Sequence, residues 1–169
     1  MSLAQRDQQH HTYADYLGWP GEIYFQLRRK LEGQPCRPFI APLDVRLPRA
    51  GEDDEAIDTV VQPDVLVVCD SARLDRRGVR GAPDFVVEVL SPATAAHDHV
   101  RKRRVYERAG VREYWLVHPT DRIVTIYRLS GAEYGKPEVC MLAGETPVGV
   151  LPGVAIAWDD LVGRLPPPE

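Results

Sequence analysis

Asp84-Phe85-Val86-Val87-Glu88-Val89-Leu90-Ser91-Pro92 contains an apolar run with a single acid at its centre. Its apolar residues are mostly β-branched or aromatic, which is typical of a strand, and the prolines that flank it favour a short strand buried on both faces. Because side chains alternate along a strand, Glu88 shares a face with Val86 and Leu90. A carboxylate among apolar side chains costs several kcal/mol unless it is compensated. The sequence therefore predicts a partner for Glu88: a metal ion, a buried cation or a proton.

Length and composition indicate one globular domain. The chain has 169 residues, of which 44% are hydrophobic and 27% charged, and no apolar run approaches the roughly 18 residues of a membrane span. We expect a single domain over residues 1–169, with N-terminal helices at 12–35, a core at 36–165, a tail at 166–169 and no membrane contact.

The cysteines bear on the expected compartment. Cys36, Cys69 and Cys140 are odd in number, far apart and without C-x-x-C spacing, which argues against a zinc ribbon or a disulfide framework. No signal-peptide pattern opens the chain. The sequence therefore predicts a cytoplasmic protein.

The formal net charge of −4 hides an uneven distribution. Five acids lie in the expected loop at 48–59, and without them the balance would be about +1. The bases form three clusters, at residues 28–30, 73–80 and 101–104. Such clusters are more often solvated surface than phosphate sites, so charge alone neither indicates nor excludes a nucleic-acid partner.

The remaining elements follow from hydrophobic periodicity and from turn residues. One or two helical turns at 12–17 should end at Gly18 and Pro20, and an amphipathic helix should follow at 23–31. A further helix should start at 94 or 98 and end at 109. Strands are expected at 37–47, 60–69, 84–90, 113–117, 122–129, 137–142 and 154–157. The acidic loop at 48–59 should be mobile, and 70–82 should be a loop.

A second carboxylate, Asp64, interrupts the apolar strand that precedes the Glu88 strand. The spacing allows a strand, a loop and a return, so the two strands can be antiparallel neighbours. Two convergent carboxylates and a backbone carbonyl suit Mg²⁺ or Mn²⁺. A lysine on the next helix, Lys102, could orient the attacking water or stabilise a pentavalent phosphate. This pattern is typical of phosphodiester hydrolysis.

At these residues the sequence resembles the Uma-type restriction endonucleases of the PD-(D/E)XK nuclease superfamily. The phrases VVQPDVLVV, PDFVVEVLSPAT and YERAGVREYWLVHP are similar to that family in order and spacing, over about residues 36–165. The resemblance implies an α/β fold with a restriction-endonuclease-like core, a mixed central β-sheet flanked by helices. It also implies Asp64 and Glu88 as metal ligands, and a homodimer.

The sequence departs from the family pattern at two places. Leu90 stands where the E-x-K motif usually has its lysine, and by resemblance Lys102 on the following helix takes that place. Family members also have a β-hairpin and a longer helix start near residues 21–23, where this chain is shorter. We therefore assign no acidic ligand from the first helix, and we expect a truncation or missing residues near 21–23.

Two further residues are candidate supporting groups. Asp98 and Tyr106 share a helix face with Lys102 at i, i+4, i+8 spacing, although Asp98 can also cap the helix and Tyr106 can belong to the core. Asp64 could instead cap a turn, and Glu88 could pair with Lys102 or an arginine without a metal. The candidates for phosphate contacts are Arg101, Arg103, Arg76 and Arg77.

Two functional hypotheses follow from these residues. The first is an Mg²⁺-dependent endonuclease, a hydrolase that cuts DNA phosphodiester bonds. In it Asp64, Glu88 and the Val89 carbonyl hold Mg²⁺ or Mn²⁺, and Lys102 acts on the nucleophilic water. The second is a nuclease fold retained as a catalytically inactive module that binds nucleic acid or protein, with an ion pair between Glu88 and Lys102 where the metal would sit.

Overall fold

A seven-stranded mixed sheet organises the protein in the computed structural model, which describes residues 13–91 and 96–164. The strand order is β1-β4-β7-β8-β9-β10, and β11 also pairs with β9. The strands are β1 (Arg37–Ile40), β4 (Val65–Val68), β7 (Phe85–Val89), β8 (Glu113–His118), β9 (Ile123–Ser130), β10 (Glu133–Tyr134) and β11 (Glu138–Met141). The β7–β8 pair is parallel and the other pairs are antiparallel.

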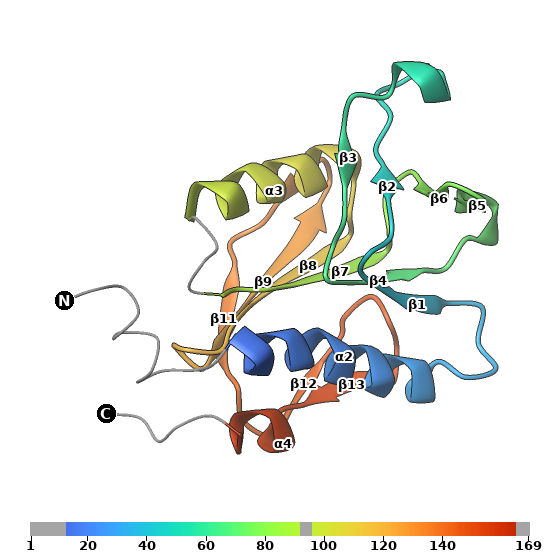
Figure 1. Cartoon of the computed structure of the whole chain (residues 1–169). Coiled ribbons are helices and arrows are strands. Elements are labelled where there is room, and N and C mark those ends of the chain that lie inside the picture. Colours follow the sequence, from blue (N-terminus) through green and yellow to red (C-terminus); the bar gives the residue numbers. More distant parts are fainter. Residues whose placement is uncertain (1–12, 92–95, 165–169) are drawn as a thin grey trace.

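Helices cover both faces of this sheet (Figure 1). Helix α3 (Ala96–Ala109) crosses one face between the parallel strands β7 and β8. On the opposite face lie α2 (Tyr13–Lys30), the small sheet of β12 (Glu145–Pro147) and β13 (Ala155–Ala157), and α4 (Asp159–Val162). The predicted architecture, a mixed sheet flanked by helices, is confirmed.

Strand β7 separates two apolar cores, as its sequence predicts. All five of its residues are buried. Phe85, Val87 and Val89 belong to the core under α2, whereas Val86 belongs to the core under α3. Alternation therefore places Glu88 on the α3 face, among apolar side chains.

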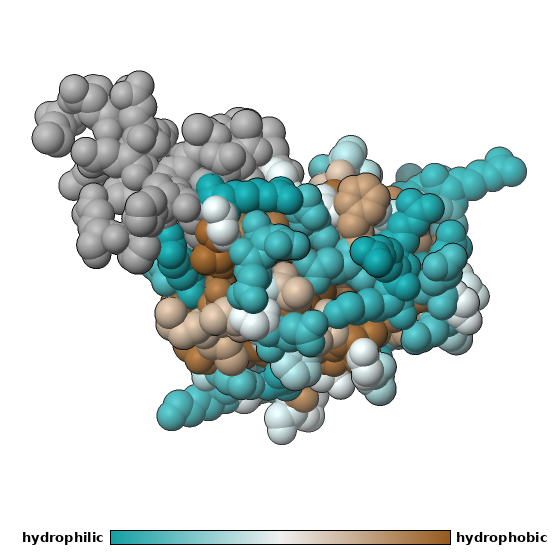
Figure 2. Space-filling model, turned by 90° about the horizontal axis from the view of Figure 1, so that it is seen from below, coloured by the Kyte–Doolittle hydropathy of each residue, from teal (hydrophilic) through white to brown (hydrophobic). Residues whose placement is uncertain are grey.

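Helix α2 packs on the core of the face opposite α3 through residues spaced four apart. Trp19, Ile23 and Leu27 are almost fully buried, and this spacing puts them on one side of the helix. On the surface of this side of the molecule, apolar side chains appear in patches separated by hydrophilic ones (Figure 2). No helix among the described residues is both long and apolar enough to cross a membrane.

The two expected N-terminal helices form one continuous helix. Pro20 lies inside α2 and removes one backbone donor, but the buried residues on both sides of it hold the helix together. The expected end at Gly18 and Pro20 is therefore wrong, and α2 runs without a break through residues 21–23.

A second, four-stranded sheet interrupts two of the expected long strands. Its order is β3-β2-β6-β5, from β2 (Val45–Arg46), β3 (Val60–Val61), β5 (Leu74–Asp75) and β6 (Gly78–Arg80). The expected strand at 37–47 divides into β1 and β2 around a cis peptide bond at Ala41–Pro42, and the one at 60–69 divides into β3 and β4. The expected loop at 70–82 contains β5 and β6.

The acidic loop is attached to this second sheet by arginines. Asp54, in the 3₁₀ turn η1 (Asp54–Ala56), forms ion pairs with Arg46 at 3.1 Å and with Arg80 at 2.5 Å. Arg77 forms an ion pair with Glu55 at 3.3 Å. Several opposite charges therefore connect this segment to the second sheet, and its mobility stays a prediction.

A disulfide joins Cys36 to Cys69. The β1–β4 register pairs Arg37 with Val68, which places the two cysteines opposite each other one residue further along. The prediction against disulfides is therefore wrong, because separation in sequence gave no information about the pairing of β1 and β4. The cysteines no longer support the predicted cytoplasmic location.

Candidate functional site

The pairing of β4 with β7 brings the two predicted carboxylates together. The register pairs Leu66 with Val86 and Val65 with Val87, so Asp64 stands opposite Glu88 one step further. Both acids share the α3 face, because their neighbours Leu66 and Val86 belong to the core under α3. The Asp64 Oδ2 atom accepts a hydrogen bond from the Val89 backbone N–H at 2.8 Å.

Helix α3 supplies two partners for the buried Glu88 carboxylate. Its Oε1 atom accepts a hydrogen bond from the Tyr106 hydroxyl at 2.6 Å and lies 3.4 Å from the Lys102 Nζ atom. Lys102 and Tyr106 are four residues apart, so one helix face presents both. The Glu88 side chain is 3% exposed and that of Lys102 26% exposed, so the acid is buried while the lysine is partly exposed to solvent.

The charge balance of the site favours the addition of a proton or a cation. Burial, together with the negative charge of Asp64, raises the pKa of Glu88 to about 7. The opposing effects of Lys102 and the Tyr106 hydroxyl do not offset this rise. Burial and the nearby Glu88 also raise the pKa of Tyr106, which therefore stays a hydrogen-bond donor.

The oxygen atoms that remain fit a hard divalent ion. Both contacts of Glu88 fall on Oε1, and neither Glu88 Oε2 nor Asp64 Oδ1 makes a hydrogen bond or ion pair with any residue that the structure describes. The described residues contain no group of three or more His, Cys, Asp or Glu side chains that could hold a metal. Two carboxylates are nevertheless enough for Mg²⁺, which usually keeps several waters.

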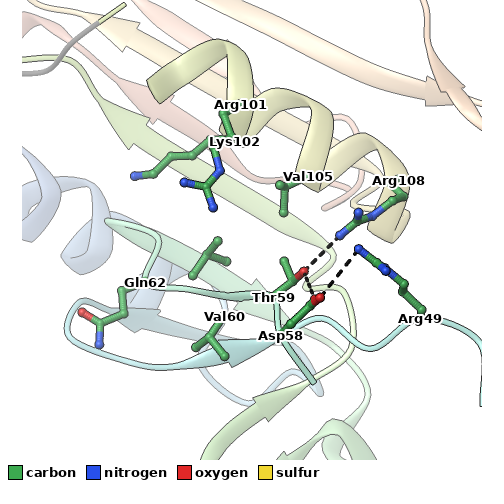
Figure 3. Close-up of a pocket in the computed structure, with 10 residues that line it drawn as sticks. Arg49, Asp58, Thr59, Val60, Gln62, Arg101, Lys102, Val105 and Arg108 are labelled. Carbon is green, nitrogen blue, oxygen red and sulfur yellow. Dashed lines mark hydrogen bonds and ion pairs between the residues drawn. The ribbon is translucent and has the colours of Figure 1, made fainter. Parts of the chain in front are cut away.

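A groove opens beside Lys102, between α3 and β3 (Figure 3). It has a volume of about 670 Å³. Figure 3 shows Arg101, Lys102, Val105 and Arg108 on α3, across from residues that lie in β3 and next to it. The groove is lined by Arg49, Asp58, Thr59, Val60, Val61, Gln62, Arg101, Lys102, Val105 and Arg108.

The other predicted residues are dispersed. Of the candidate phosphate contacts, only Arg101 lines the groove. Arg103 packs over the Tyr127 ring at 5.6 Å, and Arg76 and Arg77 lie in the β5–β6 hairpin, where Arg77 is paired with Glu55. The side chain of Asp98 lies outside the part of the chain that the structure describes.

A further buried carboxylate, Glu113, was not predicted from the sequence. It is fully buried and accepts hydrogen bonds from the Trp115 indole and from the backbone N–H groups of Gly149 and Val150. Its neighbour Trp115 belongs to the core under α2, so Glu113 points away from Asp64 and Glu88 and holds the 149–150 turn. The sequence does contain a signal that could have identified this residue, because Glu113 is an acid at the start of an apolar run.

A solved structure shows the same fold. The chain is similar to a "putative nuclease belonging to DUF820" from Anabaena variabilis, with a TM-score of 0.68 and 20% identity over 88% of this chain and 80% of that one. This similarity confirms the restriction-endonuclease-like α/β core. A DrdV–DNA complex matches with a TM-score of 0.33 and 12% identity, over 73% of this chain and 12% of that one, which is too distant to support any inference.

Sequence comparison agrees with the structural one. No curated protein matches the chain. The sequence model of the Uma2 family, described as "Putative restriction endonuclease", matches residues 19–159, which is most of the chain and includes Asp64, Glu88 and Lys102. The chain therefore belongs to the Uma2 family.

Proposed function

We propose that this protein is a metal-dependent endonuclease that hydrolyses phosphodiester bonds in DNA. One observation carries the proposal: Asp64 and Glu88 share a face of adjacent antiparallel strands, and the Lys102 amine lies 3.4 Å from Glu88 Oε1. Membership of a nuclease family agrees with it.

The two acids would hold Mg²⁺ or Mn²⁺ through Asp64 Oδ1 and Glu88 Oε2. The Val89 N–H points at Asp64, and in an antiparallel ladder the N–H and C=O of one residue point to the same side. This orientation supports the Val89 carbonyl as a third protein ligand. A bound ion would lower the pKa of a coordinated water and neutralise charge on the phosphoryl group.

Lys102 and Tyr106 would perform the remaining tasks. The Lys102 amine is partly exposed beside Glu88, where it can orient the attacking water or stabilise charge on the phosphate. The Tyr106 hydroxyl fixes Glu88 through Oε1, which leaves Oε2 for the metal.

The test is nicking of supercoiled plasmid in Mg²⁺ or Mn²⁺. Wild-type protein should nick the plasmid, and Glu88→Ala and Lys102→Ala should abolish nicking while circular dichroism shows an intact fold. The exposed residues Glu133 and Lys136 provide matched controls, and Glu133→Ala and Lys136→Ala should nick as wild type does. Equal nicking by the wild type and both site variants would indicate a contaminating nuclease and refute the proposal.

A second candidate is a nucleic-acid- or protein-binding module without turnover. It predicts the ion pair between Glu88 and Lys102, and the structure contains that pair. Isothermal titration with Mn²⁺ separates the two functions. A nuclease should give binding heat that Glu88→Ala removes, whereas the module should give no such heat.

A further inference from the structure

We propose that the groove between α3 and β3 binds the sugar–phosphate backbone of one nucleic-acid strand and leads it to the Asp64–Glu88 site. The proposal rests on the proposed function in one respect: the bond to be cut lies at the Lys102 end. Lys102 connects the two sites, because it lines the groove and also contacts Glu88.

The charges that line the groove favour a polyanion. Four of the ten lining residues are cationic and one, Asp58, is acidic. Asp58 lies 3.8 Å from Arg49, so these two charges largely offset each other. Arg108 donates to the hydroxyl of Thr59 at 3.2 Å, which is a neutral partner, and Arg101 makes no ion pair with any described residue.

The arginines of the second sheet provide an internal contrast. Arg46, Arg77 and Arg80 are equally basic, but each is paired with an acid of the same sheet or of the acidic loop. Acids of the same protein therefore offset the positive charge of these arginines. By contrast, Arg101 and Arg108 of α3 form no ion pair with an acid among the residues that the structure describes.

The spacing of the α3 arginines suits successive phosphates. Arg101 and Arg108 are seven residues apart, which is about two helical turns and about 10 Å along the axis. Arg104 stands between them and lines a smaller hollow with both. Phosphates of one strand advance by about 3.4 Å each along a duplex, so the row spans about three phosphates.

The chemistry of the lining predicts the kind of recognition. Guanidinium groups bind phosphate oxygens through paired hydrogen bonds, and such contacts position a strand without reading its sequence. None of the ten lining residues is aromatic, so the groove has no platform on which bases could stack. Binding should therefore be independent of sequence and strongly dependent on salt.

The experiment measures binding separately from cleavage. Anisotropy of labelled oligonucleotides is titrated with protein in EDTA, between about 50 and 200 mM salt. Arg101→Ala/Arg108→Ala should weaken binding of every sequence and lower the slope of log affinity against log salt by about 2. Arg28→Ala/Arg29→Ala is the matched control, since it removes the same charge from exposed positions of α2 on the opposite face, and it should change neither quantity.

Equal losses in both double variants, or none in either, would overturn the groove proposal. Parallel titrations with single-stranded and with duplex oligonucleotides identify which form the groove binds. A loss of affinity in Arg101→Ala/Arg108→Ala but not in Arg28→Ala/Arg29→Ala, for either form, supports the groove proposal.

Different results would refute the groove proposal and the proposed nuclease activity. Glu88→Ala should bind the oligonucleotide at least as tightly as wild type, because it leaves the groove intact and removes a negative charge. Wild type that binds through α3 but never nicks would refute the proposed function and leave the groove standing. Wild type that nicks, with binding unchanged by Arg101→Ala/Arg108→Ala, would refute the groove alone.

Discussion

At the scale of a single residue, Glu88 is a buried carboxylate in an environment that disfavours its negative charge. It is almost fully buried, faces Asp64 and has a pKa of about 7, above its usual value of 4.5. A buried carboxylate with this pKa is destabilising when charged and becomes acceptable when a cation arrives. This property agrees with the proposed divalent-ion site, since a bound cation would stabilise the charged carboxylate.

This pKa makes the stability of the metal-free protein depend on pH. Because the folded pKa is raised, the contribution of Glu88 is fully present below pH 4.5 and is lost as pH rises through about 7. The full loss is about 3 kcal/mol. In EDTA, urea unfolding should therefore show that Glu88→Gln gains about that much relative to wild type at about pH 8, and little at pH 4.5. Identical pH profiles for both proteins would contradict a raised pKa.

Tyr106 should act as a positioning residue for the Glu88 carboxylate. Tyr106→Phe removes the hydroxyl that donates to Oε1 and keeps the ring that packs against Tyr114. Loss of such a partner typically weakens metal binding by about 10- to 100-fold, which titration with Mn²⁺ would measure.

Tyr134→Phe is the matched control for this change. Tyr134 donates to the Val111 carbonyl instead, so its loss should leave Mn²⁺ affinity unchanged. Wild-type Mn²⁺ affinity in Tyr106→Phe would exclude a positioning role for the hydroxyl.

At the scale of elements, the sequence predicted what depends on local pattern. The apolar run of β7 predicted a buried strand, and its spacing from the apolar run before it allowed β4 as an antiparallel neighbour; both are found. The i, i+4 spacing of Lys102 and Tyr106 predicted that they share a helix face, and in the structure both contact Glu88. These features need only alternation and helical periodicity.

Pairing between distant segments could not be predicted in the same way. The sequence does not state that Cys36 faces Cys69, because this follows from the register of β1 on β4. The groove likewise forms only because β3 separates from β4 and lies beside α3. The continuity of α2 through Pro20 depends on burial of Trp19 and Ile23, which overrides the local signal to end the helix.

The disulfide should stabilise the edge of the main sheet. It joins β1 to β4 across a separation of 33 residues, and closure of a loop of that length contributes about 2–4 kcal/mol. Cys36→Ala/Cys69→Ala should lower the free energy of unfolding in urea by this amount, whereas Cys140→Ala, at the unpaired cysteine, should change it little. If a reductant shifted neither the wild-type midpoint nor that of the double variant, the two thiols would not be bonded in solution.

At the scale of the molecule, the sheet separates the larger apolar core from the face that carries the proposed site. The α2 face buries the larger core and Glu113, while the α3 face carries the two acids, Lys102 and the groove. The net charge of −4 is misleading for this reason. Acids such as Asp54 and Glu55 are paired with arginines of the second sheet, so the α3 surface remains basic and open to an anionic strand.

The measurement that tests the central claim most directly is the anomalous scattering of a crystal soaked in Mn²⁺. One strong peak should appear between Asp64 and Glu88, with the Val89 carbonyl turned toward it, and the peak should be lost in Glu88→Ala. Saturating Mn²⁺ without a peak there, and with the Lys102 amine still seated on Glu88, would contradict the claim.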